Sequence, residues 1–220
     1  MRTKTIVAID GPAGAGKSTI AKLLAKRIGA DYIDTGAMYR AVGLQLIRTG
    51  TDYNDPEALQ AMLDAIDVDF SEGRTILNGE DVSGLIRTPE ISAITSPSSG
   101  VPAIRYKLTA LQQAMGQRKS IVMDGRDIGT VVFPDADFKF YLTASADERA
   151  RRRTEEMRAK GEEADFETIR ADIIQRGYQD SHREFRPLRK AEGAVEIDST
   201  DMSIESVVET MMAFIEARDR

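Results

Sequence analysis

Glycines, one lysine and two hydroxyl groups lie within nine consecutive positions near the start of the chain, in the stretch GPAGAGKST. Residues 11–18 match the pattern G-x-x-x-x-G-K-[ST] at every fixed position, after an apolar run and before a helix-like pattern. Glycines let the backbone curl so that its N–H groups point at phosphate oxygens, and the helix start adds a partial positive charge. The stretch therefore predicts a site for the phosphates of a nucleoside triphosphate.

The residues of this loop have separate expected roles. Lys17 would reach the β- and γ-phosphates, and Ser18 would ligate magnesium. The residues expected to contact the triphosphate are Gly11, Pro12, Ala13, Gly14, Ala15, Gly16, Lys17, Ser18 and Thr19. A Gly-rich turn without a ligand is the plain alternative, but it needs neither the lysine nor the hydroxyl. A dinucleotide loop is disfavoured because Thr19 occupies its third glycine position.

Charged and polar side chains also follow the next two apolar runs. Phosphoryl transfer requires two anionic groups to be positioned and their moving charge neutralised, so arginines are expected there. Ligands of α/β folds bind at the carboxyl ends of strands. The side chains at these two ends are Asp34, Thr35, Tyr39, Arg40, Asp124, Arg126 and Asp127.

Three further charged residues, Arg176, Asp180 and Arg183, have spacings of four and three that place them on one helix face. Solvated salt bridges on that helix are the alternative. Asp124 ends an apolar run and is a candidate to hold magnesium through water; its alternative is a cap on the next turn. His182, the only histidine, is expected to be a neighbour of the site and not a catalyst.

Short β-branched runs alternate with longer helical patterns, which is typical of a parallel sheet covered by helices on both faces. Strands are expected at residues 5–9, 32–34, 121–124, 138–142 and 195–198. In the helix between the first two, Ile20, Leu23, Leu24 and Ile28 recur at helical spacing until Gly29 ends it.

Two segments interrupt this alternation. Residues 52–100 contain an Asn78-Gly79 turn between strand-like runs, which predicts an inserted antiparallel hairpin. The stretch ERARRRTEEMRAKGEEADFET predicts a charged helix, interrupted at Gly161, that could act as a mobile flap. Since acids and bases are nearly balanced in it, a solvated helix with i, i+4 ion pairs is the alternative.

Composition narrows the class of protein. The 220 residues are 41% hydrophobic, carry a net charge of −6, contain no cysteine and include no apolar run long enough for a membrane span. We expect one compact domain, a soluble cytoplasmic monomer that binds neither nucleic acid nor a membrane. An N-K-x-D guanine motif and a G-x-S-x-G elbow are absent from the sequence, which disfavours a GTPase and a serine hydrolase. An ATP-driven motor usually needs a much larger chain or a partner domain, so a small-molecule kinase is the favoured class.

Five motifs together are more selective: GPAGAGKST, DTGAMYRA, DGRDIGTVVFPDAD, the proline-leucine of FRPL, and IDST. In this order the chain resembles the bacterial cytidylate kinase family over essentially its full length. The resemblance implies an ATP:CMP phosphotransferase of pyrimidine nucleotide metabolism, acting on CMP and dCMP. It also implies a P-loop nucleoside monophosphate kinase fold: a five-stranded parallel sheet flanked by helices, a monophosphate-binding insertion with a small antiparallel sheet, and a short lid. The implied bounds are residues 1–34, 117–150 and 166–220 for the core, 35–116 for the insertion and 151–165 for the lid.

The resemblance also assigns roles to matching residues. The implied substrate-binding residues are Thr35, Arg105 and Asp127 around the cytosine, Ser96, Arg176 and Asp180 at the pentose, and Arg40, Arg126 and Arg183 near the acceptor phosphate and the transferring group. A carboxylate at Asp127 suits cytosine because it accepts from the exocyclic amine, where uracil presents an oxygen.

The implied lid arginines are Arg152, Arg153 and Arg158, which would close over the ATP phosphates and exclude water. The residues expected to act in catalysis are Lys17, Arg126, Arg183 and Arg152, with magnesium held by Ser18 and Asp124.

The sequence departs from the family pattern at Gly177, where relatives often have an acid, and at Thr35, which replaces a serine of some members. Gly177 leaves the preference between CMP and dCMP open. A kinase for UMP or for a non-nucleotide acid such as shikimate, and a nucleotide-binding module without catalysis, also stay open as alternatives.

Overall fold

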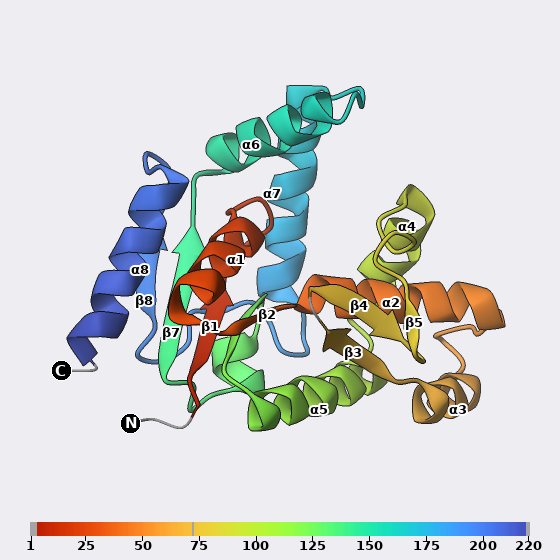
Figure 1. Cartoon of the computed structure of the whole chain (residues 1–220). Helices are drawn as coiled ribbons and strands as arrows, with labels where there is room; N and C mark the ends of the chain where they lie inside the picture. The colour runs from red at the N-terminus through yellow and green to blue at the C-terminus, as the bar shows by residue number, and fades with distance from the viewer. Residues whose placement is uncertain (1–3, 72, 219–220) are drawn as a thin grey trace.

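A five-stranded parallel sheet forms the centre of the computed structural model, which describes residues 4–71 and 73–218 (Figure 1). Its strands are β1 (Ile6–Asp10), β2 (Asp31–Asp34), β6 (Ile121–Gly125), β7 (Phe138–Thr143) and β8 (Val195–Asp198), in the order β2-β6-β1-β7-β8. All five predicted strands are confirmed to within one residue at each end. The parts of the predicted domain division at residues 1–3, 72 and 219–220 lie outside the described residues, and the division itself stays a prediction.

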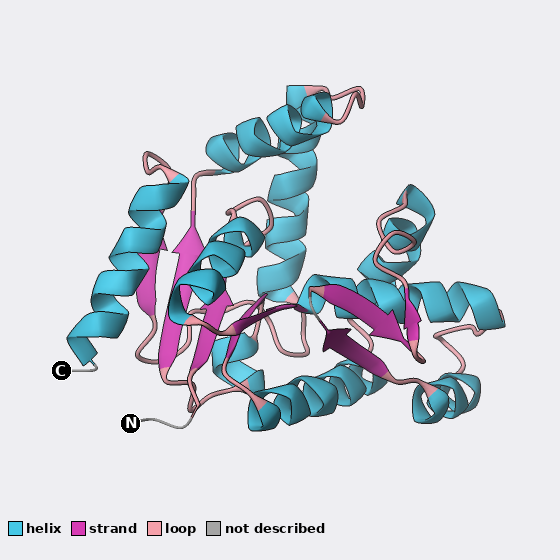
Figure 2. Cartoon of the chain, viewed as in Figure 1, coloured by secondary structure: helices cyan, strands magenta, loops and turns pink. Residues whose placement is uncertain are grey.

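The central strands β1 and β6 are buried on both faces, which explains why they are nearly continuous apolar runs, whereas the edge strands β2 and β8 each bury one residue and carry exposed acids. Val7 and Ile9 of β1 pack with α1 (Lys17–Ile28) and α8 (Ile204–Arg218), whereas Ala8 packs with α2 (Thr35–Thr49) and α5 (Pro102–Arg118). Figure 2 shows these helices on either side of the strands. Helix α1 ends at Gly29 as expected, but Leu23 is 42% exposed, so the buried face of this helix is narrower than its apolar spacing predicts.

The inserted segment of residues 52–100 contains α3 (Pro56–Ala65), a sheet of β3 (Val68–Ser71), β4 (Arg74–Leu77) and β5 (Glu80–Asp81), and α4 (Pro89–Ser98). Asn78 and Gly79 have φ angles of 51° and 85°, so both central residues of the β4–β5 turn are left-handed and the predicted hairpin is confirmed. The structure adds β3, which pairs antiparallel with β4. In Figure 1 this insertion lies beside α2, to the right of the parallel sheet.

Helices α6 (Ala146–Ala159) and α7 (Phe166–His182) form a helical hairpin above the carboxyl edge of the sheet (Figure 1). They share a small core of Ala150, Ile169 and Ile173. Within the described residues no helix is both long and apolar enough to cross a membrane. Because the strands are parallel, the segments that follow them lie at one edge of the sheet, beneath this hairpin. These segments are the β1–α1 loop, the start of α2, the turn η1 (Ile128–Val132) after β6 and the loop after β8.

The β1–α1 loop approaches β7 closely at Gly11, and Gly29, which also has a positive φ, offers a comparison. A Cβ at Gly11 would lie 1.9 Å from the carbonyl oxygen of Leu142, whereas a Cβ at Gly29 would meet nothing within 4 Å. We expect Gly29→Ala to lower the free energy of unfolding by about 1 kcal/mol, its conformational cost alone. Gly11→Ala should lower it by at least twice as much, measured by urea denaturation. Equal losses of unfolding free energy in the two variants would mean that the loop and β7 can move apart at no cost.

Candidate active site

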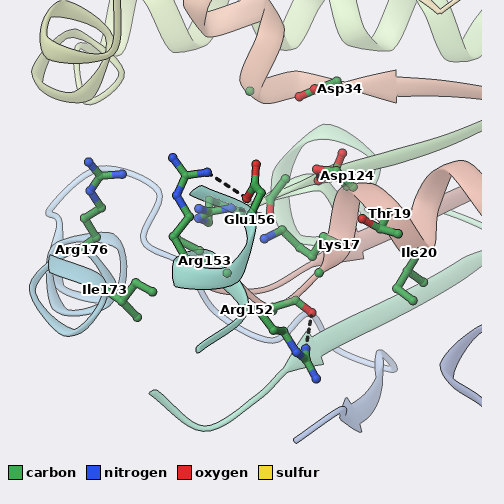
Figure 3. Close-up of a pocket in the computed structure, with 18 of the residues that line it drawn as sticks. Lys17, Thr19, Ile20, Asp34, Asp124, Arg152, Arg153, Glu156, Ile173 and Arg176 are labelled. Carbon is green, nitrogen blue, oxygen red and sulfur yellow. Dashed lines mark hydrogen bonds and ion pairs between the residues drawn. The ribbon is translucent and has the colours of Figure 1, made fainter. Parts of the chain in front are cut away.

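An open cavity of about 1730 Å³ lies at the carboxyl edge of the sheet, between the β1–α1 loop, the α6–α7 hairpin and the insertion (Figure 3). Most predicted site residues line it: Ala13, Gly14, Ala15, Gly16, Lys17, Ser18, Thr19, Thr35, Arg40, Arg105, Asp124, Arg126, Asp127, Arg152, Arg153, Arg176, Asp180 and Arg183. Gly11, Pro12, Ser96 and Arg158 are not among its lining residues. The structure thus brings the two predicted halves of the site together, and the role of each residue stays a prediction.

The β1–α1 loop has the backbone that its glycines predict. Gly14 and Gly16 have φ angles of 79° and 87°, and a Cβ at Gly14 would lie 3.0 Å from the Arg149 Cβ. Helix α1 begins directly after Gly16, which has no side chain to cap the first N–H groups. These groups border the cavity, where they suit an anionic ligand.

Lys17 is buried inside this loop, with 6% of its surface exposed, and its Nζ donates to the carbonyl oxygen of Pro12 at 2.8 Å. Burial lowers the pKa of Lys17, and the positive charge of Arg126 lowers it further. The carboxylates of Asp124, Asp10 and Asp180 counter this effect in part. A phosphate beside Lys17 would oppose burial in the same way, so the lysine is placed to favour an anion.

Asp124 accepts hydrogen bonds from side chains and not from a following turn, so its predicted alternative as a cap is wrong. Its Oδ2 accepts from Ser18 Oγ at 3.0 Å and its Oδ1 from the Tyr32 hydroxyl at 2.8 Å. Its backbone oxygen accepts from Thr35 Oγ1 at 2.7 Å. Burial, followed by the neighbouring charge of Asp34, raises the pKa of Asp124. Sequence analysis missed Tyr32, a strand residue in β2 with no motif of its own.

Asp10, at the end of β1, is a second buried carboxylate that sequence analysis missed. Its two oxygens accept from the backbone N–H groups of Ile128 at 2.8 Å and Gly129 at 2.7 Å. Burial raises the pKa of Asp10 to about 6, although these two hydrogen bonds lower it in part. Asp10 thereby fixes the backbone directly after Arg126 and Asp127. An acid that directly follows an apolar strand is the only signal of it in the sequence.

Arg105 and Asp127 form a buried ion pair on the insertion side of the cavity. Arg105 Nη2 donates to Asp127 Oδ2 at 2.7 Å, and the side chains are 3% and 9% exposed. Arg105 Nη1 donates to the carbonyl oxygen of Ser99 at 2.9 Å, while its Nε has no hydrogen-bond partner in the described part of the chain. This pair presents a carboxylate of fixed orientation to the cavity.

Asp180 lies between two arginines from different elements. Arg126 Nε donates to Asp180 Oδ2 at 2.7 Å, and Arg183 Nη2 lies 3.8 Å from Asp180 Oδ1. These contacts join β6 to α7, so the alternative of purely solvated salt bridges on α7 is wrong for Asp180. Burial, and then the charge of Arg105, lowers the pKa of Arg183. The exposed Arg176 of α7 borders the same cavity (Figure 3).

Arg40 enters the cavity from α2, where its Nη1 donates to Ser92 Oγ at 2.7 Å. Burial lowers the pKa of Arg40, and the nearby charge of Arg87 adds to this effect. Several guanidinium groups thus line one cavity, an arrangement that favours a polyanionic ligand.

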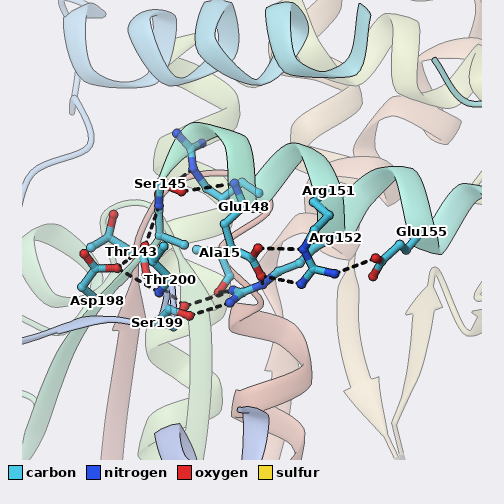
Figure 4. Close-up of polar contacts among 12 residues, drawn as sticks. Ala15, Thr143, Ser145, Glu148, Arg151, Arg152, Glu155, Asp198, Ser199 and Thr200 are labelled. Atoms are coloured by element: carbon cyan, nitrogen blue, oxygen red, sulfur yellow. Dashed lines mark hydrogen bonds and ion pairs between the residues drawn. The ribbon is translucent and has the colours of Figure 1, made fainter. Parts of the chain in front are cut away.

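The charged helix α6 divides into two parts (Figure 4). Arg152 donates to Glu148 Oε1 at 2.7 Å, to the carbonyl oxygen of Ser199 at 2.6 Å and, at 3.4 Å, to that of Ala15 in the loop. Arg149, which sequence analysis did not assign, donates to the Ala13 carbonyl oxygen at 3.0 Å.

For Arg151 and Arg153 the predicted alternative of ion pairs within the helix applies. Arg153 pairs with Glu156 at 2.9 Å, and Arg151 with Glu148 and Glu155. Arg158 donates to the carbonyl oxygen of Ala164 at 3.2 Å, in the turn between α6 and α7. The first half of α6 is therefore fastened to the β1–α1 loop, and its second half is not.

One end of the cavity was missed altogether. It lies in and after the loop that follows β8, and its residues are Ser199, Met202, Ser203, Ile204 and Val207. The IDST motif ends the fifth parallel strand, so the carboxyl-end rule was the available signal.

Three remaining residues, Ser96, His182 and Gly177, are not among the residues that line the cavity. Ser96 is exposed on α4, where Thr95 and Ser99 border the cavity instead, and its predicted role stays a prediction. His182 stacks on Tyr178 with ring centroids 3.9 Å apart, outside the cavity lining. A Cβ at Gly177 would meet nothing within 4 Å.

Known proteins match this chain over nearly its whole length. The family model described as cytidylate kinase matches residues 7–217. A cytidylate kinase of Clostridium perfringens is 48% identical over 210 residues, covering 96% of this chain and 97% of the relative. One of Clostridium acetobutylicum is 51% identical over 209 residues, covering 95% and 96%. A solved shikimate kinase of Bacteroides thetaiotaomicron has a TM-score of 0.50 at 13% identity, covering 96% and 98%, which shows the fold alone.

The raised pKa of Asp10 predicts a pH dependence of stability. An unfolded aspartate titrates near 3.8, so the folded chain holds this proton more tightly and its free energy of unfolding falls as the pH rises from about 4 to about 6. Asp10→Asn cannot titrate. We expect wild type to lose up to about 3 kcal/mol relative to this variant between pH 4 and pH 7, measured by urea denaturation. Exposed Asp135→Asn is the control, and parallel curves for Asp10→Asn and wild type would contradict the prediction.

Proposed function

Because the chain belongs to the cytidylate kinase family, we propose that it transfers the γ-phosphoryl group of ATP to the phosphate of CMP, giving ADP and CDP. The observation that carries this proposal is the buried Arg105–Asp127 pair, which borders the same cavity as the phosphate-binding loop. One side of the cavity suits a triphosphate, and the other offers a carboxylate that a cytosine amine can donate to.

On the donor side, Lys17 and the N–H groups at the start of α1 would bind the triphosphate. Ser18 Oγ and Asp124 Oδ2 lie 3.0 Å apart at this position, and both are oxygen ligands of the kind that Mg²⁺ prefers. Among the described residues no cluster of three or more carboxylate, histidine or cysteine ligands occurs, so the ion would take its other ligands from phosphates and water. When bound, it would neutralise charge on the β- and γ-phosphates.

On the acceptor side, Asp127 would accept from the cytosine amine, since Arg105 holds its carboxylate in place. Arg126, Arg183 and Arg40 would bind the acceptor phosphate and the transferring group. The acceptor phosphate is already an anionic nucleophile, so no general base is required. Catalysis then consists of positioning two anions in line and stabilising the charge between them.

We extend the proposal to dCMP, with the pentose beside Arg176, Asp180 and, less closely, Ser96. Asp180 Oδ1 is 3.8 Å from Arg183, which leaves room for a sugar hydroxyl to donate to it. We also propose a monomer that acts in the cytoplasm, as the sequence predicts. Size-exclusion chromatography with light scattering tests the first of these two properties.

One experiment separates this function from its alternatives. The protein is incubated with ATP and Mg²⁺ in separate reactions with CMP, dCMP, UMP, AMP and shikimate, and the phosphorylated products are separated by chromatography. We expect CDP and dCDP as the main products. Phosphorylation of shikimate or UMP in preference to CMP would refute the proposed acceptor. ATP binding without any product would favour a module without catalysis.

Replacing the buried lysine tests the donor side. We expect Lys17→Met to lower kcat by about a thousandfold or more, because its charge stabilises the transferring group. The fold should be retained, since an apolar side chain of similar length replaces a buried charge. A coupled ADP assay measures turnover, and circular dichroism the fold. Lys26→Met, at an exposed position of α1, is the control. Undiminished turnover of Lys17→Met would show that the loop does not serve phosphoryl transfer.

Asp127→Asn tests the acceptor side with little change of shape. The amide can still accept from Arg105, whereas alanine would leave that buried charge unpaired. We expect the preference for CMP over UMP, as the ratio of kcat/KM values, to narrow by about 1–3 kcal/mol. Exposed Asp135→Asn should leave the ratio as it is. An unchanged preference in Asp127→Asn would place the base pocket elsewhere.

A further inference from the structure

The segment that follows α7 is fastened to helix α5 by a cluster outside the cavity lining, which we name the Arg186 clamp: Tyr106, Thr109, Phe185 and Arg186. The rings of Tyr106 and Phe185 have centroids 5.4 Å apart at 57°. The Arg186 guanidinium carbon lies 4.8 Å from the Tyr106 centroid and 4.9 Å from that of Phe185. Arg186 Nη1 also donates to Thr109 Oγ1 at 2.7 Å. One guanidinium thus contacts two aromatic faces and a hydroxyl.

The backbone of Arg186 has a conformation that is unfavourable for arginine. Its φ is 52°, and only Asn78 shares a positive φ among the described residues other than glycine. Asn78 lies in a hairpin turn that requires this region, whereas Arg186 precedes Pro187, where the backbone is normally extended. The left-handed conformation costs an arginine roughly 1–2 kcal/mol, so it persists only where surrounding contacts hold it.

Arg183 lies three residues before Arg186 on the same segment. Among the described residues Arg183 Nε and Nη2 are buried without a hydrogen-bond partner, and Nη2 is 3.8 Å from Asp180. Its backbone is set on one side by α7, where the Arg183 N–H donates to the Gln179 carbonyl oxygen. On the other side of Arg183, the next fixed contacts along the chain are those of the Arg186 clamp.

Helix α5 contributes to both sides of this arrangement. Arg105, which pairs with Asp127, directly precedes Tyr106 of the clamp. Arg105 and Arg183 are like charges that repel one another, as the lowered pKa of Arg183 reflects, secondary to burial. The carboxylates of Asp180 and Asp127 offset this repulsion in part. The clamp joins the helix that carries Arg105 to the segment that carries Arg183.

We propose that Arg186 is a positioning residue for phosphoryl transfer: it holds Arg183 beside the Arg105–Asp127 pair before the acceptor binds. This inference rests on the proposed function, because Arg183 is assigned there to the acceptor phosphate. Without the clamp, the acceptor would have to bring the two arginines together itself, and part of its binding energy would be lost to that rearrangement.

Steady-state kinetics of Arg186→Ala test the proposal. We expect kcat/KM for CMP to fall by about tenfold or more, because a small displacement of a group at the reacting phosphate is costly. The KM for ATP should stay within about twofold of wild type, since the clamp contacts join α5 to the segment after α7 and none of them involves the β1–α1 loop. Exposed Arg189→Ala, on the same segment, is the matched control and should behave as wild type.

Tyr106 is 58% exposed, so both a conservative and a disruptive substitution can be made there with little effect on the core. Tyr106→Phe keeps the ring and should keep wild-type kinetics, whereas Tyr106→Ala should reproduce the loss of Arg186→Ala. The double variant Arg186→Ala/Tyr106→Ala should have the same kcat/KM for CMP as either single variant, because each single substitution already removes the clamp. Arg186→Gly relieves the left-handed backbone without restoring the contacts, so it should be as impaired as Arg186→Ala.

Three results would overturn the proposal. One is wild-type kinetics in Arg186→Ala, and another is full activity in Arg186→Gly. The third is a lowered melting temperature of Arg186→Ala accompanied by equal losses of kcat/KM for CMP and for ATP, which a merely structural role would produce. A wild-type protein that forms no CDP refutes the proposed function and the clamp together, whereas active wild type with an unaffected Arg186→Ala refutes the clamp alone.

Discussion

Repulsion between positive charges is the constraint on which the cavity depends. Guanidinium groups from α2, α5, β6, α6 and α7 converge on one space, and the carboxylates between them make this possible. Asp180 lies between Arg126 and Arg183, and Asp127 pairs with Arg105. A buried pair of this kind adds little net stability, but removing one partner is costly because an unpaired charge remains. The carboxylates therefore keep the arginines close together. Some guanidinium N–H groups remain without a partner in the described residues and can donate to a bound anion.

The parallel sheet turns this electrostatic arrangement into a site. Because its strands run in one direction, residues distant in sequence emerge at the same edge. Asp10 then adds a contact that the topology alone does not supply, since its carboxylate holds the backbone of Ile128 and Gly129 across neighbouring strand ends. The orientation of Arg126 and Asp127 thus depends on a residue that does not line the cavity.

Local sequence patterns were sufficient to predict the parallel sheet and the phosphate-binding loop. Strands buried on both faces are apolar at nearly every position, and a loop that binds phosphate needs glycine, lysine and a hydroxyl at fixed spacing, so both are local signals. The resemblance to a family placed most of the acceptor side. Contacts between distant residues were not accessible in this way: nothing near Asp10 indicates Ile128, and nothing near Arg152 indicates Ser199. Ser96 shows a different limit, because the packing of α4 on α2 sets which face of α4 borders the cavity.

The contacts of α6 with the phosphate-binding loop have a mechanical consequence. Arg149 and Arg152 join the loop to α6, α6 shares a core with α7, Asp180 of α7 binds Arg126, and Arg126 follows the strand that pairs with β1. These connections form a closed ring that returns to the loop. Breaking one connection in a ring leaves its parts joined through the others. The ring therefore links the phosphate-binding loop, α6, α7 and β6 into one frame, in which a displacement of any one part is shared by the parts on either side of it.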